Sequence, residues 1–429
     1  MYGYRILSFL FAWLIPSHKI RNEFRQLCEG KDLVQDFRAV QTNYQRCLAK
    51  LKTKQKQKVI FLVNDNTKWK AQSLYDLMAT SKDFEPIILL SLAEKQRNLP
   101  ISKKIDIINN NLEFFCKKGI ECKIGWDLKK DKALSPNKFG ADIVFYQQPW
   151  GIPKIQKPQT VSKYAITCYI PYFVPNYGIL SMDCRTFHKY LYRYYVLNED
   201  WKELYANYMK EFSSNLFAVG HTMLDYFYLN KDELSGDNLI IYAPHWSIKH
   251  PKNENNTNYS TFDSFGQKIL DYAKSHPEQK WLFKPHPKLY STLEKTGIMT
   301  QDEIEKYYAQ WEKIGTTCYD GDYINYFKNS KALITDCGSF LTEYFCTGKP
   351  VIHLQQEEIK NIPEPFKKIL NTYYKATTSE ELYKYLDEIL ANNIDTKFEE
   401  RKSLQKELKL SEQYAAKNII DNLRKAIYG

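Results

Sequence analysis

From Val59 onward, short apolar runs alternate with amphipathic stretches, and this alternation constrains the fold more than any other feature of the chain. A first series contains "VIFLV", "PIILLS", "DIVFYQQ" and "YAITCYI", and a second contains "NLIIYAP", "KWLFKP", "KALITD" and "PVIHLQ". Strands that are apolar throughout and alternate with helices are typical of parallel sheets covered on both faces. The sequence therefore predicts an α/β protein with two doubly wound domains.

The turn-rich segment "LSGDN" at 234–238 separates the two series. We accordingly expect an N-terminal interfacial and helical arm at 1–57, a first Rossmann-like domain at 58–234, a second at 235–410 and a C-terminal helix at 411–429. A length of 429 residues fits two or three domains. The nine cysteines form no C-x-x-C pair, which is typical of a reduced cytoplasmic protein.

The N-terminal arm begins with an apolar run, Ile6 to Ile15, that is too short to span a bilayer and has no small-residue cleavage site after it. Trp13 and the nearby cations favour a segment that lies in a membrane interface. The alternative is a helix packed on its own domain or on a partner subunit.

Apolar residues then recur at spacings of four and three, at Leu33, Phe37, Val40, Tyr44, Cys47 and Leu51. This pattern predicts the seam of a helix pair or short coiled coil, through which a homo-oligomer could form.

The formal net charge of +11 suits nucleic acid, an anionic membrane surface or a phosphate-rich substrate. The aromatic residues lie within the apolar core runs, and no stacking motif or recognition-helix signature accompanies them. We therefore expect a membrane surface among the partners and no nucleic acid.

Polar residues gather where the strands of the second series end. "IIYAPHW" places His245 there, "WLFKPHP" places Lys284 and His286, and "ALITDCGS" places Asp336 and Ser339. Because parallel strands end at the same edge of a sheet, we expect one cleft to collect these residues. A lysine, two histidines and a helix N-terminus suit a diphosphate leaving group, since fixed donors stabilise the negative charge that develops on it.

The helix that follows Asp336 would supply the N–H groups of Gly338, Ser339 and Phe340, and Glu343 one turn later could accept from ribose hydroxyls. The alternative for Ser339 is a simple helix cap. A D-x-D pair, Asp320 and Asp322, is interpreted as a turn that caps the next helix. We expect neither a metal nor any other cofactor.

Several of these segments together resemble a known family. "YAPHWS", "FKPHP" and "YDGDYINYFKNSKALITDCGSFLTEYFCTGKPVIHL" are similar, in order and spacing, to the C-terminal domain of the CDP-glycerol glycerophosphotransferases, which build teichoic acids and related envelope polymers. "FAVGHTMLDYF" at 217–227 resembles the family's G-x-P-R-x-D segment and keeps Gly220 and Asp225 around His221. The resemblance implies a GT-B fold, with a cleft between two Rossmann-like domains and a CDP-activated alcohol held in the C-terminal one.

Carried over by position, the resemblance gives His286 and Ser339 contacts to the donor phosphates, Asp336 a role in shaping the turn and Glu343 a place near the ribose. It adds Gly220, His221 and Asp225 to the donor-binding residues. Lys284, His286 and His245 are the candidate catalytic residues.

The chain departs from the family at three points. The family's W-H-G-T-P segment, which carries its base, corresponds to "ITCYIPYF" at 166–173, which has no histidine, and Met223 replaces the arginine of G-x-P-R-x-D. His245 stands where the family often has threonine. His245 is thus a candidate base or, alternatively, a hydrogen-bond donor to phosphate.

The function that follows is transfer of a glycerophosphate or other phosphoalditol unit from CDP-glycerol or a similar donor to a glycan or lipid-linked acceptor. The product would be a capsule, lipopolysaccharide or teichoic-acid-like polymer, made by a cytoplasmic protein that is peripheral on the inner face of the cell membrane. The alternatives are a glycosyltransferase that uses a sugar nucleotide, a nucleotide-sugar 2-epimerase of the same fold, and a non-catalytic nucleotide-binding scaffold. The membrane-like N-terminus argues against the epimerase, and the missing histidine favours the scaffold.

Overall fold

The computed structural model describes residues 37–174, 185–230, 238–248, 259–319, 323–355 and 362–429. The segment expected in a membrane interface and the pair Asp320 and Asp322 lie outside these ranges. The chain forms two compact units that divide between Met223 and Leu224, and Tyr414–Gly429 belongs to the first unit.

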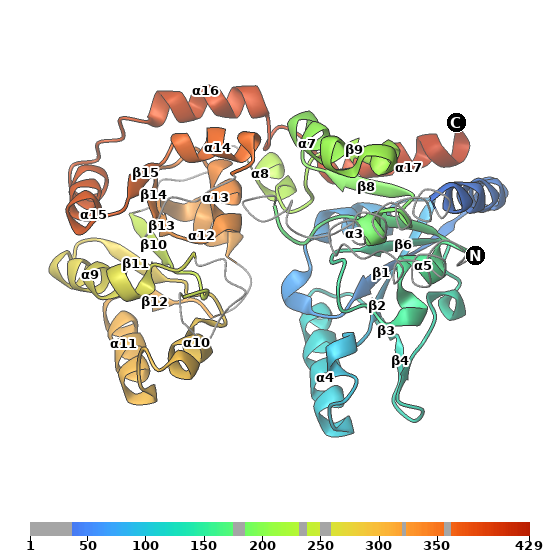
Figure 1. Ribbon diagram of the computed structural model, residues 1–429, viewed down its shortest axis with the longest axis horizontal. Helices are drawn as coiled ribbons and strands as arrows, with labels where there is room; N and C mark the ends of the chain where they lie inside the picture. The colour runs from blue at the N-terminus through green and yellow to red at the C-terminus, as the bar shows by residue number, and fades with distance from the viewer. Residues whose placement is uncertain (1–36, 175–184, 231–237, 249–258, 320–322, 356–361) are drawn as a thin grey trace, which may run out of the picture. The chain divides into compact units, whose positions relative to one another are not determined.

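The first unit is built on a seven-stranded parallel sheet with the strand order β3-β2-β1-β6-β7-β8-β9 (Figure 1). Its central strands are mostly apolar and almost entirely buried, as expected for a sheet covered on both faces. The strands are β1 (Gln57–Val63), β2 (Phe84–Leu90), β3 (Cys122–Ile124), β6 (Ile143–Tyr146), β7 (Ile166–Tyr169), β8 (Arg193–Val196) and β9 (Leu216–Ala218).

Helices flank this sheet, and a short antiparallel hairpin of β4 (Trp126–Asp127) and β5 (Lys132–Ala133) projects from it. The hairpin is tied to the nearest helix because Lys104 Nζ donates to both carboxylate oxygens of Asp131 at 2.7 Å. The helices are α3 (Gln72–Ala79), α4 (Ile101–Cys116), α5 (Pro158–Val161), α6 (Arg185–His188), α7 (Glu199–Met209) and α17 (Ala415–Tyr428).

The apolar seam predicted in the N-terminal arm is buried within the first unit. Residues 37–52 are helical, and Val40, Tyr44, Cys47 and Leu51 belong to the core that also contains β1 and α17. Tyr44 is fully buried, and its hydroxyl donates to the Tyr190 carbonyl at 2.6 Å. The described part of the seam therefore packs into the first unit's own core, and Leu33 lies outside the described residues.

The second unit is built on a six-stranded parallel sheet with the strand order β12-β11-β10-β13-β14-β15. The strands are β10 (Leu239–Ala243), β11 (Lys280–Phe283), β12 (Thr316–Thr317), β13 (Ser330–Thr335), β14 (Val351–Leu354) and β15 (Tyr374–Ala376). Both series of apolar runs thus form parallel sheets with flanking helices, and the predicted α/β fold class is confirmed.

Helices α9 and α11 pack with this sheet into a core that includes the parallel rings of Phe283 and Trp311, whose centroids are 5.1 Å apart. A buried cation fixes the last helix of the unit, since Arg401 donates to the carbonyl of Gly348 at 2.8 Å and to the carboxylate of Asp395. The helices are α8 (Asp225–Leu229), α9 (Phe262–Ser275), α10 (Leu289–Thr296), α11 (Gln301–Ile314), α12 (Ile324–Asn329), α13 (Gly338–Phe345), α14 (Glu364–Asn371), α15 (Ser379–Leu386) and α16 (Phe398–Leu408).

Candidate functional site

Three neighbouring strands of the second unit bring the predicted polar residues to one edge of the sheet. Strand β10 lies between β11 and β13, with Tyr242 level with Phe283 and Ala243 level with Thr335. Lys284 and Asp336 therefore leave their strands on either side of the turn that carries His245. The strand order reverses between β10 and β13, and this switch point is where open α/β sheets bind their ligands.

The buried carboxylate of Asp336 accepts hydrogen bonds from two segments at this edge. The side chain is 2 % exposed, and its oxygens accept from the backbone N–H of His245 at 2.5 Å, from the backbone N–H of Thr261 at 2.6 Å and from the Thr261 hydroxyl at 2.9 Å. Burial raises the pKa of Asp336 to about 6, against the opposing effect of these hydrogen bonds. Asp336 thus fixes the turn after β10 and the start of α9.

His245 is held in one tautomer by its own turn. The backbone N–H of Ser247 donates to His245 Nδ1 at 3.2 Å, and the Ser247 hydroxyl lies 2.8 Å from the same nitrogen. Because Nδ1 accepts, the proton of the neutral ring is on Nε2. Burial, together with the charge of Lys288, lowers the pKa of His245 to about 4.

His286 repeats this arrangement on the adjacent strand. The backbone N–H of Lys288 donates to His286 Nδ1 at 3.1 Å, and the backbone N–H of His286 donates to the Pro244 carbonyl at 3.0 Å. Burial lowers the pKa of His286 to about 3, with further contributions from His245 and the two neighbouring lysines. The centroids of the two imidazole rings are 5.2 Å apart.

The two histidines therefore form a pair of neutral Nε2–H donors at neutral pH. Within the described part of the chain, neither Nε2 has a hydrogen-bond partner, whereas both Nδ1 atoms are occupied by the backbone. Such fixed donors can bind the oxygens of a phosphate without reorganisation. A neutral imidazole whose proton is on Nε2 cannot accept a proton there, so this geometry favours the donor role of His245 over the role of base.

Lys284 adds a buried side chain to the same edge. It is 4 % exposed, and its Nζ lies 5.9 Å from the ring centroid of Tyr323. The Tyr323 hydroxyl donates at 2.6 Å to Glu343, which is 1 % exposed. Glu343 thus takes part in a buried hydrogen bond beside the lysine, rather than standing alone at the ligand edge.

The N-terminus of α13 has no side-chain cap. The N-cap residue is Cys337, and its side chain makes no capping hydrogen bond. The Ser339 hydroxyl instead lies 3.7 Å from the Cys337 sulfur. Ser339 does not cap the helix here, and the first-turn N–H groups of Gly338, Ser339 and Phe340 are placed where an anion could use them.

The residues of the "FAVGHTMLDYF" segment are divided between the two units. Gly220 and His221 belong to the first unit, and Asp225 begins α8 and is fully buried. His221 is 3 % exposed, and its Nε2 lies 2.9 Å from the Pro171 carbonyl while its Nδ1 accepts from the backbone N–H of Met223 at 3.2 Å. Both of its nitrogens are used inside the first unit.

Two residues that position the site were missed in the sequence. Ser247 holds the His245 ring, and its hydroxyl also accepts from the backbone N–H of Tyr259 at 3.1 Å. Thr261 contributes two of the three donors to Asp336. A serine two residues after a histidine was visible as a pattern, but nothing in the sequence links Thr261 to Asp336.

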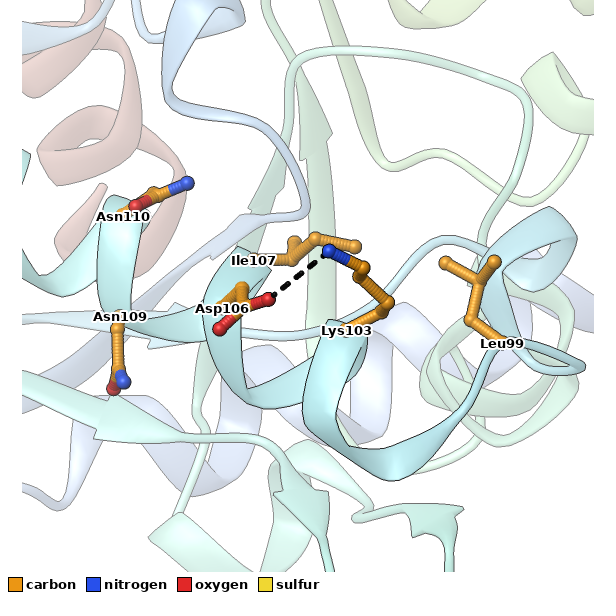
Figure 2. A pocket seen from close by; sticks show the side chains of 6 residues that line it. All are labelled: Leu99, Lys103, Asp106, Ile107, Asn109 and Asn110. Carbon is orange, nitrogen blue, oxygen red and sulfur yellow. Dashed lines mark ion pairs between the residues drawn. The ribbon is translucent and has the colours of Figure 1, made fainter.

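The first unit carries a surface hollow of about 540 Å³ along α4, lined by Leu99, Lys103, Asp106, Ile107, Asn109 and Asn110. Figure 2 shows these side chains and the ion pair between Lys103 and Asp106, whose charged atoms are 3.7 Å apart. The lining includes none of the candidate catalytic or donor-binding residues.

No three His, Cys, Asp or Glu side chains within the described ranges gather closely enough to hold a metal ion. No helix within them combines the length and the apolar character needed to cross a bilayer.

The structure is similar to those of nucleotide-sugar and teichoic acid enzymes at low sequence identity. The wall teichoic acid polymerase TagF matches with a TM-score of 0.54 and 12% identity over 92% of this chain and 98% of TagF. A putative UDP-N-acetylglucosamine 2-epimerase from Listeria monocytogenes matches with a TM-score of 0.53 and 15% identity over 87% of this chain and 97% of the epimerase. A UDP-GlcNAc 2-epimerase from Neisseria meningitidis matches with a TM-score of 0.54 and 12% identity over 86% of this chain and 100% of the epimerase.

Comparison of the sequence with protein-family models and with curated proteins found no match. The structural likeness shows that the chain has a GT-B-like fold, as the resemblance in the sequence implied.

Proposed function

We propose that the protein transfers a glycerophosphate or related phosphoalditol unit from a CDP-activated donor to a cell-envelope glycan. The observation that carries this proposal is the pair of imidazoles at the switch point of the second sheet, each with Nδ1 occupied by a backbone N–H. Two neutral donors, the buried Lys284 and the uncapped start of α13 are the groups that a diphosphate needs.

The reaction would be an in-line displacement at the β-phosphorus. A hydroxyl oxygen of the acceptor forms a bond to that phosphorus while the bond to the bridging oxygen breaks, and CMP leaves with the electron pair of the broken bond. His245 and His286 would donate to the phosphate oxygens as negative charge develops on the leaving group. The proton of the acceptor hydroxyl would pass to solvent or to a base other than His245, because the proton on His245 Nε2 is held there by the contact with Ser247.

Structural neighbours support a nucleotide-activated donor. One is TagF soaked with CDPG, and another is the Neisseria meningitidis epimerase bound to UDP-GlcNAc. The resemblance of the strand-end motifs to the glycerophosphotransferase family favours the cytidine donor. The acceptor would be a glycan or a lipid-linked glycan, reached from the inner face of the membrane through the N-terminal segment.

A sugar-nucleotide enzyme is the second candidate, because the epimerases match the structure as well as TagF does. The same donors would then receive a departing UDP, with attack at the anomeric carbon.

Product analysis separates the two candidates. The purified protein is incubated with CDP-glycerol, and separately with UDP-GlcNAc, in the presence of a membrane fraction as acceptor, and released nucleotides are separated by chromatography. The proposal predicts CMP and a new phosphodiester signal in the ³¹P NMR spectrum. Release of UDP, or conversion of UDP-GlcNAc to its 2-epimer, with no CMP from CDP-glycerol would refute it in favour of the second candidate.

A further inference from the structure

The first sheet also has a switch point, between β1 and β6, and loops from several strands meet at its carboxyl edge. The backbone N–H of Tyr172, three residues after β7, donates to the carbonyl of Gln147, which follows β6. The Gln147 side chain accepts from the backbone N–H of Lys70 at 2.7 Å. These bonds hold the loops after β1, β6 and β7 together at one place.

Two aromatic side chains face each other on these loops. Trp150 is 38 % exposed, and its ring is edge-on to that of Tyr172 with the centroids 6.0 Å apart. The carbonyl of Trp150 accepts from Gln148 Nε2 at 2.9 Å, so the buried Gln148 fixes the loop that presents the indole. We call Trp150 and Tyr172 the aromatic platform. Tryptophan and tyrosine are enriched at binding surfaces because each combines a large apolar ring with a polar group.

A buried amide next to this edge lacks a hydrogen-bond partner. Asn64 directly follows β1 and is 5 % exposed, and within the described residues its Nδ2 has no acceptor. Buried polar groups of native proteins are nearly always paired, and exceptions occur at functional sites. The unsatisfied donor at the switch point is a second sign, independent of the aromatic platform, that this edge binds a polar ligand.

The charge at the platform distinguishes between ligand classes. Lys68 Nζ lies 5.6 Å from the Tyr172 centroid, but it also lies 3.5 Å from a carboxylate oxygen of Asp65. The cation is therefore already balanced, and a polyanionic ligand would gain little from it. A neutral ligand with an apolar face and hydroxyl or amide groups at its edge fits better.

We propose that the aromatic platform binds a pyranose ring of a neutral glycan. The C–H groups on one face of a pyranose pack against an aromatic ring, while its hydroxyls can form hydrogen bonds with polar groups of the surrounding loops. The inference deepens the proposed function, on which it rests for the assignment of this glycan as the acceptor. It commits to a ring sugar rather than to a glycerol phosphate chain, which has no apolar ring face.

Saturation-transfer NMR without any nucleotide tests this inference on the full-length protein. The probes are methyl β-glucopyranoside, methyl β-galactopyranoside and methyl N-acetyl-β-glucosaminide, with glycerol 3-phosphate as the open-chain probe. We expect transfer from the protein to the ring protons of at least one glycoside. Trp150→Ala should weaken its affinity about tenfold, as for truncation of an aromatic anchor.

The matched control is Tyr383→Ala, which removes an aromatic ring of similar exposure, 39 %, from α15. It should leave glycoside binding unchanged. The inference is wrong if no glycoside receives saturation from the wild-type protein, if Trp150→Ala binds as well as the control, or if only glycerol 3-phosphate binds. This test contains no nucleotide, so it is independent of the proposed donor. A protein that binds glycosides through Trp150 but does not bind CDP would refute the donor assignment and still support the aromatic platform.

Discussion

The donor role of His245 can be tested by replacing it with Gln and, separately, with Asn. The amide nitrogen of Gln reaches about as far as imidazole Nε2, whereas that of Asn reaches only as far as Nδ1. If His245 donates from Nε2 to a phosphate oxygen, Gln can replace it in part and Asn cannot. Loss of one preorganised donor to a developing oxyanion costs about 10² to 10³ in kcat. We therefore expect His245→Asn to lose about 10² and His245→Gln less than about tenfold.

The pH dependence of the reaction rate provides a second test of the donor role of His245. The pKa of His245 is lowered to about 4, chiefly by burial. At pH 7 only about one His245 side chain in a thousand is then protonated. The wild-type rate profile should consequently show no ionisation of His245 near pH 6.5, and both variants should keep the shape of that profile while donor binding weakens.

The assay measures release of CMP from CDP-glycerol between pH 5 and pH 9, with kcat and KM determined at each pH. Thermal unfolding of each variant verifies that the fold is intact. The donor role of His245 is refuted if Gln and Asn reduce kcat equally, by about 10² or more, and both remove an acidic limb present in the wild-type profile. That result would make His245 the base, and the tautomer assigned from the Ser247 contact would be wrong.

Three further predictions concern stability and membrane binding. The pKa of His286 is about 3 in the folded protein and about 6.5 in the unfolded chain. Between these values the unfolded chain takes up a proton that the folded chain does not. The free energy of unfolding is therefore highest above pH 6.5 and falls as the pH drops. Between pH 7 and pH 4 the wild type should lose about 3 kcal/mol more than His286→Gln in urea denaturation, and identical losses would contradict the neutral assignment. Arg401→Met should lower the free energy of unfolding by about 3 kcal/mol or more, because Asp395 loses its buried partner. The control is Lys306→Met, which removes the exposed ion pair with Asp302 and should change the free energy of unfolding by less than about 1 kcal/mol. Removal of residues 1–30 should release the protein from membranes and leave the circular dichroism spectrum of the folded units intact, and an unchanged membrane fraction would rule out the anchoring role of that segment.

The architecture of the sheets could be predicted from the sequence because it depends on local patterns. Apolar runs such as "VIFLV" and "IIYA" are buried, and their alternation with helices specifies parallel order. The gathering of His245, Lys284 and Asp336 at one edge followed from this order alone, since every parallel strand ends on the same side.

The partners of individual groups could not be predicted, because they depend on contacts between distant residues or on backbone geometry. The helix at 37–52 shows an amphipathic seam, but a seam does not reveal whether another copy or the chain's own sheet covers it. The tautomers of His245 and His286 are set by backbone N–H groups, which every residue except proline carries, so no sequence pattern marks them. His221 resembled a donor-binding residue by position, yet its two nitrogens are bonded within the first unit.

In the proposed mechanism, the switch point of the second unit binds a diphosphate through the neutral side chains of His245 and His286. Isothermal titration calorimetry of the full-length protein with CDP and with CMP measures this contact, because the two ligands differ only in the second phosphate. We predict that CDP binds at least about tenfold more tightly than CMP, since one charge-assisted hydrogen bond contributes about 1.5 kcal/mol or more. We also predict that His286→Asn removes most of this preference. Equal affinities of the wild type for CDP and CMP, or a preference that survives in His286→Asn, would show that the two histidines do not bind the second phosphate.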